Sequence, residues 1–518
     1  MRTIMVQGTA SDVGKSVIAT ALCRLLTNDG WRVAPFKSQN MSLNSFVTPD
    51  GKEIGRAQAV QADACRIPAT TDMNPILLKP TGERRSQVVV HGKPLRDYDA
   101  VEYREQYLPS AERIVRDALD RLRAAYDIVV MEGAGSPAEV NLRDRDIVNM
   151  RAAAWADAPV VLVADIDRGG VFASIVGTMA ILRPEERERV KGFIINKFRG
   201  DPSLLKSGLD WLEAETGKPV LGVVPVLPDL GIEDEDSASL ASRLRAGSGT
   251  VRAGAPLDIA VVRLPRLSNF TDVDAFAGEP DASVRFVTKP DELGTPDAVI
   301  LPGTKNTVLD LAAIRDNGLA DEVLRYAEGG GRVVGICGGY QMLGATLADP
   351  DGVESSETGA SLVDGLGLLP LDTVYATDKR TERTRSRFAG WPDGSAPADD
   401  AAGACDVEGY EIHMGVTTFR AGARHPFELP DGAGEGAMTA DGRVWGTYLH
   451  GVFDNDEFRR GWLNRLRSDK GLPPMPVAYR HRERREAAFD RLAEHVRAHI
   501  DMHAIYRMLG IPIQEAKR

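Results

Sequence analysis

Short apolar runs that end in glycine turns alternate with helical patterns along this chain of 518 residues. A first series contains RTIMVQG, WRVAPFK, YDIVVMEGAG, APVVLVADID, VKGFIINKF and PVLGVVP, and a second contains LDIAVVRLP, VRFVTKP, PDAVILPG, GRVVGICGG and VWGTYLHG. Strands that are apolar on both faces are typical of parallel sheets flanked by helices. The alternation therefore predicts the α/β class, with two doubly wound domains.

A charged and then glycine-rich segment, EDEDSASLASRLRAGSGTVRAGAP, separates the two series and has the composition of an interdomain linker over residues 233–256. We therefore predict a first domain over residues 1–232 and a second over residues 257–458. Residues 459–518 are rich in Arg and Glu and show helical periodicity. We expect them to form a helical tail that packs on the second domain.

Composition narrows the classes of partner. The net charge of -12 argues against nonspecific binding to nucleic acid or to an anionic membrane. No stretch approaches the roughly 20 apolar residues that span a bilayer, and MRTIMVQGTA lacks the pattern of an export signal. The four cysteines, Cys23, Cys65, Cys337 and Cys405, show no CxxC spacing and indicate neither a disulfide framework nor a zinc site. We expect a cytoplasmic protein, and a homo-oligomer is compatible with the sequence.

A glycine-rich segment, GTASDVGKS, follows the first apolar run and opens a helical pattern. Backbone amides around Gly8, Thr9 and Gly14 are predicted to converge on phosphate oxygens, while Lys15 neutralises charge and Ser16 reaches Mg²⁺. Five residues separate the two glycines, one more than in the usual G-x-x-x-x-G-K-[ST] motif. The segment therefore predicts a nucleotide site for ATP.

This longer spacing resembles the dethiobiotin synthetase branch of P-loop proteins. Polar residues that match the branch stand at the ends of other predicted strands, namely Lys37 in APFKSQN, Glu132 in VVMEGAGS and Asn196 in FIINKFRG. The resemblance implies that Lys37 contacts the transferred phosphoryl group and the substrate carboxylate, that Glu132 holds Mg²⁺ and that Asn196 binds adenine. Asp165 and Asp167 in VADIDRGG are weaker candidates that would orient the loop.

The second series contains a candidate nucleophile, Cys337, between an apolar run and a helical pattern in RVVGICGGYQMLG. A lone cysteine in an apolar run is usually a core residue, but a thiol at a helix N-terminus is favoured as thiolate. His450 in VWGTYLHGVF is the predicted base. Two backbone amides are predicted to stabilise the oxyanion, that of Gly338, directly after the nucleophile, and that of Gly303, in the turn after VIL. These pieces resemble a class I glutamine amidotransferase domain, which implies L-glutamine as nitrogen donor.

One position departs from the amidotransferase pattern. The usual third member of the site is a glutamate two residues after the histidine, and Val452 stands there instead. Asp454 and Glu411 are carboxylates that could orient the histidine in its place, and the sequence does not choose between them.

Several longer motifs together resemble the cobyric acid synthase family of the cobalamin pathway over nearly the whole chain. They are PFKSQNMSLNSFVTPDGKEIGRAQAVQADAC, DMNPILLKP, SQVVVHGK, LPGTKNT, GICGGYQMLG, GYEIHMG and YLHGVF. The resemblance implies a ligase that amidates the b, d, e and g carboxylates of a corrinoid, adenosylcobyrinic acid a,c-diamide, with ATP, Mg²⁺ and glutamine. Loss of the third-member glutamate is a feature of this type. Candidate partners of the polycarboxylate are Lys37, Arg56, Lys79, Arg84 and Arg85.

Two other functions compete with this one. Cobyrinate a,c-diamide synthase shares both domains but typically has a Gly-Pro-Asp-Tyr motif where this chain has KSQNM, residues 37–41. A partitioning-type ATPase switch with a relic glutaminase domain would generally carry a second lysine early in the P-loop, where this chain has TAS, residues 9–11. A carboxylate needs activation before ammonia displaces its oxygen, so a phosphate site and a glutaminase on one chain favour amidation through an acyl phosphate.

Overall fold

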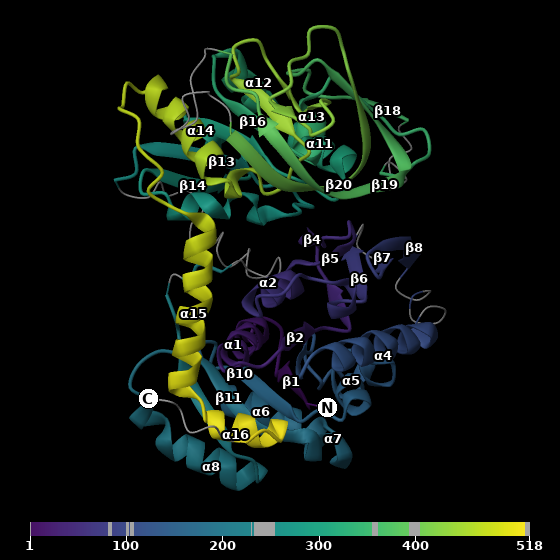
Figure 1. Cartoon of the computed structure of the whole chain (residues 1–518), viewed down its shortest axis with the longest axis vertical. Helices are drawn as coiled ribbons and strands as arrows, with labels where there is room; N and C mark the ends of the chain where they lie inside the picture. The colour runs from purple at the N-terminus through teal and green to yellow at the C-terminus, as the bar shows by residue number, and fades with distance from the viewer. Residues whose placement is uncertain are drawn as a thin grey trace. The chain divides into compact units, whose positions relative to one another are not determined.

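The computed structural model describes residues 2–80, 85–99, 103, 108–228, 230–232, 254–354, 361–392 and 405–512. Arg84 and most of the predicted linker, residues 233–253, lie outside the described residues. The chain divides into two compact units (Figure 1). The first unit comprises Met1–Ser42, Glu53–Glu235 and Arg485–Arg518, and the second comprises Leu43–Lys52 and Asp236–Arg484.

The first unit is built on a six-stranded sheet in the order β12-β11-β10-β1-β9-β2. Its strands are β1 (Arg2–Gly8), β2 (Val33–Phe36), β9 (Ile128–Glu132), β10 (Val160–Asp165), β11 (Val190–Phe198) and β12 (Val220–Pro225). All neighbouring pairs are parallel. The alternating helices are α1 (Lys15–Asn28), α4 (Leu108–Ala125), α5 (Met150–Ala156), α6 (Val171–Ile181), α7 (Pro184–Arg189) and α8 (Lys206–Thr216). The predicted doubly wound α/β fold is confirmed here.

A second, four-stranded sheet in the first unit has the order β3-β6-β7-β8. Its strands are β3 (Gln39–Met41), β6 (Ile76–Pro80), β7 (Arg85–Val90) and β8 (Lys93–Asp99), and α2 (Arg56–Ala64) precedes β6 in the chain. The apolar runs do not predict this sheet, because polar and charged residues interrupt its strands. The first strand of this sheet, β3, begins three residues after the end of β2, and Lys37 lies between the two strands.

The second unit contains another doubly wound sheet, in the order β14-β13-β15-β16-β24-β23. Its strands are β13 (Leu257–Val262), β14 (Ala282–Val287), β15 (Ala298–Leu301), β16 (Val333–Ile336), β23 (Ala437–Met438) and β24 (Val444–Thr447). Only the β23 edge pairs antiparallel within this sheet. The helices are α10 (Pro290–Leu293), α11 (Thr307–Asp316), α12 (Leu319–Glu328), α13 (Gly338–Leu343) and α14 (Asp456–Asp469). This arrangement confirms the second predicted α/β sheet.

Two long antiparallel strands, β19 (Leu371–Phe388) and β20 (Cys405–Phe419), dominate a further sheet of the second unit. Shorter strands join it, namely β17 (Thr346–Ala348), β18 (Leu362–Asp364), β21 (Phe427–Glu428) and β22 (Gly434–Glu435). In the run TERTRSRF, exposed arginines alternate with the buried Thr384, Ser386 and Phe388, because one face of the pair is exposed. The search for continuous apolar runs therefore misses these strands.

The end of the chain is helical, as predicted, and forms α15 (His481–His499) and α16 (Met502–Leu509). However, residues from Arg485 onward belong to the first unit, and not to the second as we expect from the sequence. The fully buried Arg24 of α1 lies 2.7 Å from Asp490 and 2.8 Å from Glu486. Apolar side chains of α15 and α16 share a core cluster with α1. Within the described part of the chain, no helix is long and apolar enough to cross a bilayer.

Residues Leu43–Lys52 come from the early part of the sequence but belong to the second unit. Their strand, β4 (Ser45–Val47), places Val47 in a small buried cluster with Tyr410 and Ile412 of β20. The chain passes from the first unit to the second and returns within ten residues. This insert was not expected from the sequence.

Candidate active sites

The first candidate site is the loop between β1 and α1. Gly14 has φ 92°, a left-handed conformation that favours glycine. A Cβ at Gly8 would lie 2.9 Å from the side chain of Lys15, so glycine allows the loop to close. The buried Lys15 donates from Nζ to two backbone carbonyl oxygens, at 2.8 and 3.1 Å. The Thr9 amide, which is predicted from the sequence to face phosphate, instead donates to the Val163 carbonyl of the neighbouring strand at 3.0 Å.

Glu132, at the end of β9, contacts two other predicted site residues, Ser16 and Lys37. Its Oε1 lies 2.8 Å from Ser16 Oγ and 2.9 Å from Lys37 Nζ. Its Oε2 accepts from Gln61 Nε2 at 2.6 Å, a contact that the sequence analysis missed. Strand β9 lies between β1 and β2, so the carboxyl ends of three parallel strands converge on this carboxylate.

The donor set fits a magnesium-nucleotide complex. The Ser16 hydroxyl and the Glu132 carboxylate are hard oxygen ligands, the kind that Mg²⁺ prefers. Across the described ranges, no group of three or more His, Cys, Asp or Glu side chains could hold a metal. An ion at this site would therefore take further ligands from water and phosphate oxygens, as Mg²⁺ usually does.

Asn196, on β11, lies against the same loop. Its Nδ2 donates to the Val13 carbonyl oxygen at 2.9 Å. Asp165 accepts from the Asp167 amide at 2.8 Å and lies 3.2 Å from Lys197 Nζ. These contacts give the two aspartates a local role in shaping the β10 loop.

The other basic candidates differ in their surroundings. Lys79 Nζ lies 2.6 Å from Glu53 Oε1, and both side chains are buried. Arg56 is buried at the start of α2, whereas Arg85 is exposed. The charge of Lys79 is thus already compensated within the protein, which weakens its case as a substrate ligand.

The second candidate site is centred on Cys337, which follows β16 and precedes α13. Its φ of 51° lies in the left-handed region that non-glycine residues rarely adopt, and such strain is typical of functional turns. Gly339 makes the turn feasible, because a Cβ there would lie 1.9 Å from the Leu301 carbonyl oxygen. The thiol is buried, and its Sγ lies 3.6 Å from the carbonyl oxygen of Ile412 in β20.

His450 lies three residues beyond the end of β24 and contacts a carboxylate that the sequence analysis missed. Its Nδ1 is 2.7 Å from Oδ2 of Asp272, in the 3₁₀ segment η5 (Phe270–Gly278). The other oxygen of Asp272 accepts from the Gly451 amide at 2.9 Å. Both side chains are about 1% exposed.

The surroundings of His450 hold it in the charged form. Burial by itself would lower the pKa of His450, but the charges of Asp272 and Cys337 and the hydrogen bonds to them raise that pKa to about 10. The imidazole is therefore protonated at neutral pH.

Neither carboxylate suggested by the sequence takes this place. Glu411 lies 3.1 Å from His413 and 3.2 Å from Arg380. Burial would raise the pKa of Glu411, but these two partners lower it overall. Asp454 Oδ1 lies 3.8 Å from His481. Val452, at the usual glutamate position, is fully buried in the apolar core of the second unit.

The predicted oxyanion glycines lie beside the nucleophile turn. A Cβ at Gly338 would lie 3.1 Å from the Thr304 amide nitrogen, and a Cβ at Gly303 would lie 3.0 Å from the His450 ring. The Gly339 amide donates to the Pro302 carbonyl at 3.1 Å, which joins the two turns. Side-chain bulk at either predicted position would therefore intrude on the site.

A buried polar network lies one helical turn after Cys337. Gln341 Oε1 accepts from Thr307 at 2.9 Å and from Tyr375 at 3.0 Å, while its Nε2 donates to the Tyr448 hydroxyl at 3.2 Å. His413 stacks on Tyr448 with ring centroids 3.7 Å apart. This network was not predicted, and its sign in the sequence is a glutamine within the short run GGYQML, all of which is buried.

The insert Leu43–Lys52 reaches the same site. The Ser45 amide donates to Oδ1 of Asn269, the residue before η5, at 2.9 Å. The Tyr410 hydroxyl donates to the Ser45 carbonyl at 3.4 Å, and the Tyr410 ring stacks on His450 at 5.2 Å. The insert thus contacts Tyr410, which stacks on His450, and Asn269, which lies three residues before Asp272.

Comparisons with known proteins assign a domain to each of the two regions that contain these residues. Residues 4–239 match the CobQ/CobB/MinD/ParA nucleotide binding domain, and residues 258–458 match the CobB/CobQ-like glutamine amidotransferase domain. A protein named cobyric acid synthase from Geobacillus kaustophilus is 53% identical to this chain, and the match covers 98% of this chain and 97% of the relative. A protein of the same name from Sorangium cellulosum is also 53% identical, and the match covers 98% of this chain and 99% of the relative. The relative from Salmonella agona is 50% identical, with 98% of each covered. The chain therefore belongs to the cobyric acid synthase family of glutamine amidotransferase ligases.

Proposed function

We propose that this enzyme amidates the b, d, e and g carboxylates of adenosylcobyrinic acid a,c-diamide, using ATP, Mg²⁺ and ammonia from glutamine. The observation that carries the proposal is the convergence of Ser16, Lys37 and Glu132 beside the phosphate loop on the same chain as the Cys337 turn. The names of relatives that match nearly the full chain support the corrinoid substrate.

The activation step requires positive charge and orientation. A substrate carboxylate oxygen attacks the γ-phosphorus of ATP, the bond to ADP breaks, and an acyl phosphate forms. Lys15 and Lys37 would neutralise the phosphoryl oxygens and the incoming carboxylate. Mg²⁺, held through Ser16 and Glu132, would supply further charge neutralisation. Ammonia then attacks the acyl carbon, phosphate leaves, and the nitrogen loses its extra proton to solvent.

The glutaminase step uses the thiolate and imidazolium. The Cys337 thiolate attacks the carboxamide carbon of glutamine, while amides at Gly303 and Gly338 would stabilise the oxyanion. His450 then donates its proton to the leaving nitrogen, which departs as ammonia and leaves a thioester. The neutral imidazole takes a proton from water, which attacks the thioester and releases glutamate. Asp272 would stabilise the imidazolium throughout.

The decisive experiment supplies ATP, Mg²⁺ and glutamine with adenosylcobyrinic acid a,c-diamide and follows the product by mass and by NMR of the side chains. We expect successive replacement of hydroxyl by amino groups at the b, d, e and g positions. A parallel reaction with cobyrinic acid tests the a,c-diamide synthase alternative. Amidation of cobyrinic acid alone would contradict the proposal, and release of no ammonia from glutamine would favour the ATPase switch.

Replacement of Asp272 by Asn should lower glutamine-dependent turnover on the order of 100-fold, because a neutral amide stabilises the imidazolium poorly. Asp272 raises the pKa of His450, so its loss lowers that pKa. The alkaline limb of the turnover profile, where the proton donor is lost, should therefore move to lower pH. The control is Asp454→Asn, since Asp454 is the partner suggested by sequence spacing. A larger loss in Asp454→Asn than in Asp272→Asn would contradict the assignment.

Replacement of Val452 by Glu should not improve the glutaminase. Asp272 already occupies Nδ1 of His450, and the new carboxylate would be buried in the apolar core. An unpaired buried charge costs free energy, so we expect a lower melting temperature and equal or lower glutamine-dependent turnover. The control is Val452→Ile, which keeps the position apolar. A rise in glutamine-dependent turnover for Val452→Glu would show that Asp272 does not perform the orienting role.

A further inference from the structure

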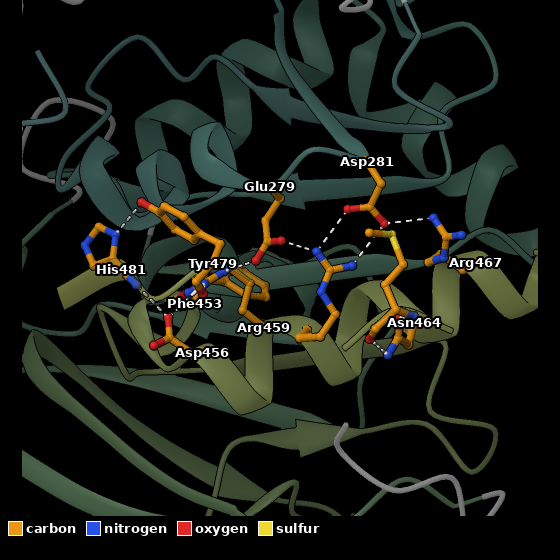
Figure 2. Close-up of polar contacts among 11 residues, drawn as sticks. Glu279, Asp281, Phe453, Asp456, Arg459, Asn464, Arg467, Tyr479 and His481 are labelled. Atoms are coloured by element: carbon orange, nitrogen blue, oxygen red, sulfur yellow. Dashed lines mark hydrogen bonds and ion pairs between the residues drawn. The ribbon is translucent and has the colours of Figure 1, made fainter. Parts of the chain in front are cut away.

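The second unit contains a buried ion-pair cluster formed by Glu279, Asp281, Arg459, Arg460 and Arg467. Figure 2 labels Glu279, Asp281, Arg459 and Arg467 of this cluster. The three arginines come from α14, and the two acids follow η5 and precede β14. Arg459 and Arg460 are fully buried. Removing guanidinium groups from water is costly, and such buried pairs are weak evidence for a role in stability.

Arg459 has contacts with three separate segments, as Figure 2 shows. Its Nε donates to Glu279 at 2.7 Å, and its Nη1 donates to the Phe453 carbonyl oxygen at 2.8 Å. Its Nη2 donates to Asp456 at 2.8 Å and to the Tyr479 carbonyl oxygen at 3.0 Å. A planar guanidinium directs these hydrogen bonds in fixed directions, which an ammonium group does not reproduce.

Two of these segments adjoin the His450–Asp272 pair. Glu279 directly follows η5, which carries Asp272. Phe453 belongs to η6 (Val452–Asp454), which begins two residues after His450. The rings of Phe276 in η5 and Phe453 in η6 pack with centroids 4.6 Å apart. Arg459 therefore ties the end of one segment to the other across this aromatic contact.

We propose that Arg459 is a positioning residue, which fixes η5 against η6 and so sets the geometry of the hydrogen bond between Asp272 and His450. The proposal rests on the glutaminase role given above to Cys337, His450 and Asp272. Asp272 and His450 are 178 positions apart in the sequence, so the chain itself does not hold the carboxylate near the histidine, and contacts between the two segments must do so. A rigid link between the two segments supplies that restraint.

Arg467 provides a matched comparison. It lies on the same helix, is also buried, and donates to Asp281 at 3.0 Å and to the Pro473 carbonyl oxygen at 2.6 Å. Asp281 lies two residues beyond Glu279, and Pro473 lies after α14, so neither partner is the residue that directly follows η5 or a residue of η6. Replacing Arg467 by Lys perturbs the same cluster without cutting the link that we assign to Arg459.

The experiment compares Arg459→Lys with Arg467→Lys in the full chain. For Arg459→Lys we expect the kcat of glutamine hydrolysis to fall about 10- to 100-fold with KM near the wild-type value, as for other small displacements of catalytic groups. A weaker Asp272 contact should also move the alkaline limb of the profile to lower pH. Amidation driven by ammonium salt should stay near the wild-type rate. Arg467→Lys should lower the melting temperature but keep kcat and the pH profile.

The rate at which iodoacetamide alkylates Cys337, followed by peptide mass against pH, gives a second readout that does not need turnover. The dependence of this alkylation rate on pH should change for Arg459→Lys and not for Arg467→Lys. If Arg459→Lys does not fold, Glu279→Gln removes the charge of the acid that directly follows η5 and pairs with Arg459 and Arg460, with little change in shape. We expect the same pH shift. A wild-type kcat and pH profile in Arg459→Lys, or in a folded Glu279→Gln where that variant is used, would overturn the proposal. Equal kcat losses in the Arg459→Lys and Arg467→Lys proteins would also overturn it.

Failure of the glutaminase assignment would look different. Glutamine hydrolysis that persists in His450→Ala would show that another group is the base, and the positioning proposal would fall with it. Loss of activity in His450→Ala together with unchanged Arg459→Lys kinetics would leave the glutaminase assignment intact and would overturn only the role of Arg459.

Discussion

Replacement of Cys337 by Ser is expected to lower glutamine-dependent amidation by at least about 10⁴-fold, while amidation driven by ammonium salt persists. A serine hydroxyl at this turn has a far higher pKa than a thiol, so the adjacent imidazolium does not convert it into an anion. The activation centre around Lys15, Lys37 and Glu132 does not use the thiol. Added ammonia should therefore replace the product of the missing step.

The measurement is initial rate with saturating glutamine and, separately, with ammonium chloride. Cys405→Ser serves as the matched control, because Cys405 is a half-buried thiol in the same unit at the edge of β20. That variant should keep both activities. Loss of both activities in a folded Cys337→Ser protein would contradict the division of labour between the two centres.

Sequence reasoning located the residues that stand at strand ends. In a parallel sheet the carboxyl ends of neighbouring strands share one edge, so Lys37 after β2 and Glu132 at the end of β9 could be expected to meet. The same logic placed Cys337 after β16 beside the Gly303 turn after β15. The apolar runs predict such positions well because burial on both faces leaves a continuous signal.

The partner of His450 could not be predicted in this way. The usual orienting carboxylate is found by its spacing from the histidine, whereas Asp272 lies in a short 3₁₀ segment with no periodic pattern. The structure brings the two together through packing of Phe276 on Phe453 and through the Asp272 contact with Gly451. Pairwise packing between distant segments leaves no local mark in a single sequence.

The C-terminal helix α15 and the insert Leu43–Lys52 show a second limit of prediction from sequence. Periodicity in α15 indicates that Phe489, Leu492 and Val496 are buried, but it does not say against which unit. Likewise, Leu43–Lys52 lies within the predicted first domain, residues 1–232, yet this segment belongs to the second unit and contacts Tyr410 and Asn269. Membership of a packed unit depends on partners, which a hydrophobic pattern does not identify.

Replacement of Lys15 by Ala is expected to lower amidation by roughly 10² to 10³-fold with glutamine and with ammonium salt alike. The buried amine, held over the loop by two carbonyl oxygens, is the cation that would meet the phosphates, and both nitrogen sources need the acyl phosphate. The matched control is Arg168→Ala, which removes an exposed cation paired with Asp12 of the same loop and should have little effect.

Labelling of Cys337 by a glutamine-analogue electrophile separates this loss from a loss of fold. It should continue in Lys15→Ala, because the thiol and His450 lie in the second unit and share no residue with the phosphate loop. Labelled protein without amidation, from either nitrogen source, would locate the defect in carboxylate activation. ATP-dependent amidation at the wild-type rate in Lys15→Ala would mean that the loop between β1 and α1 does not bind the transferred phosphate, and the activation site would have to lie elsewhere.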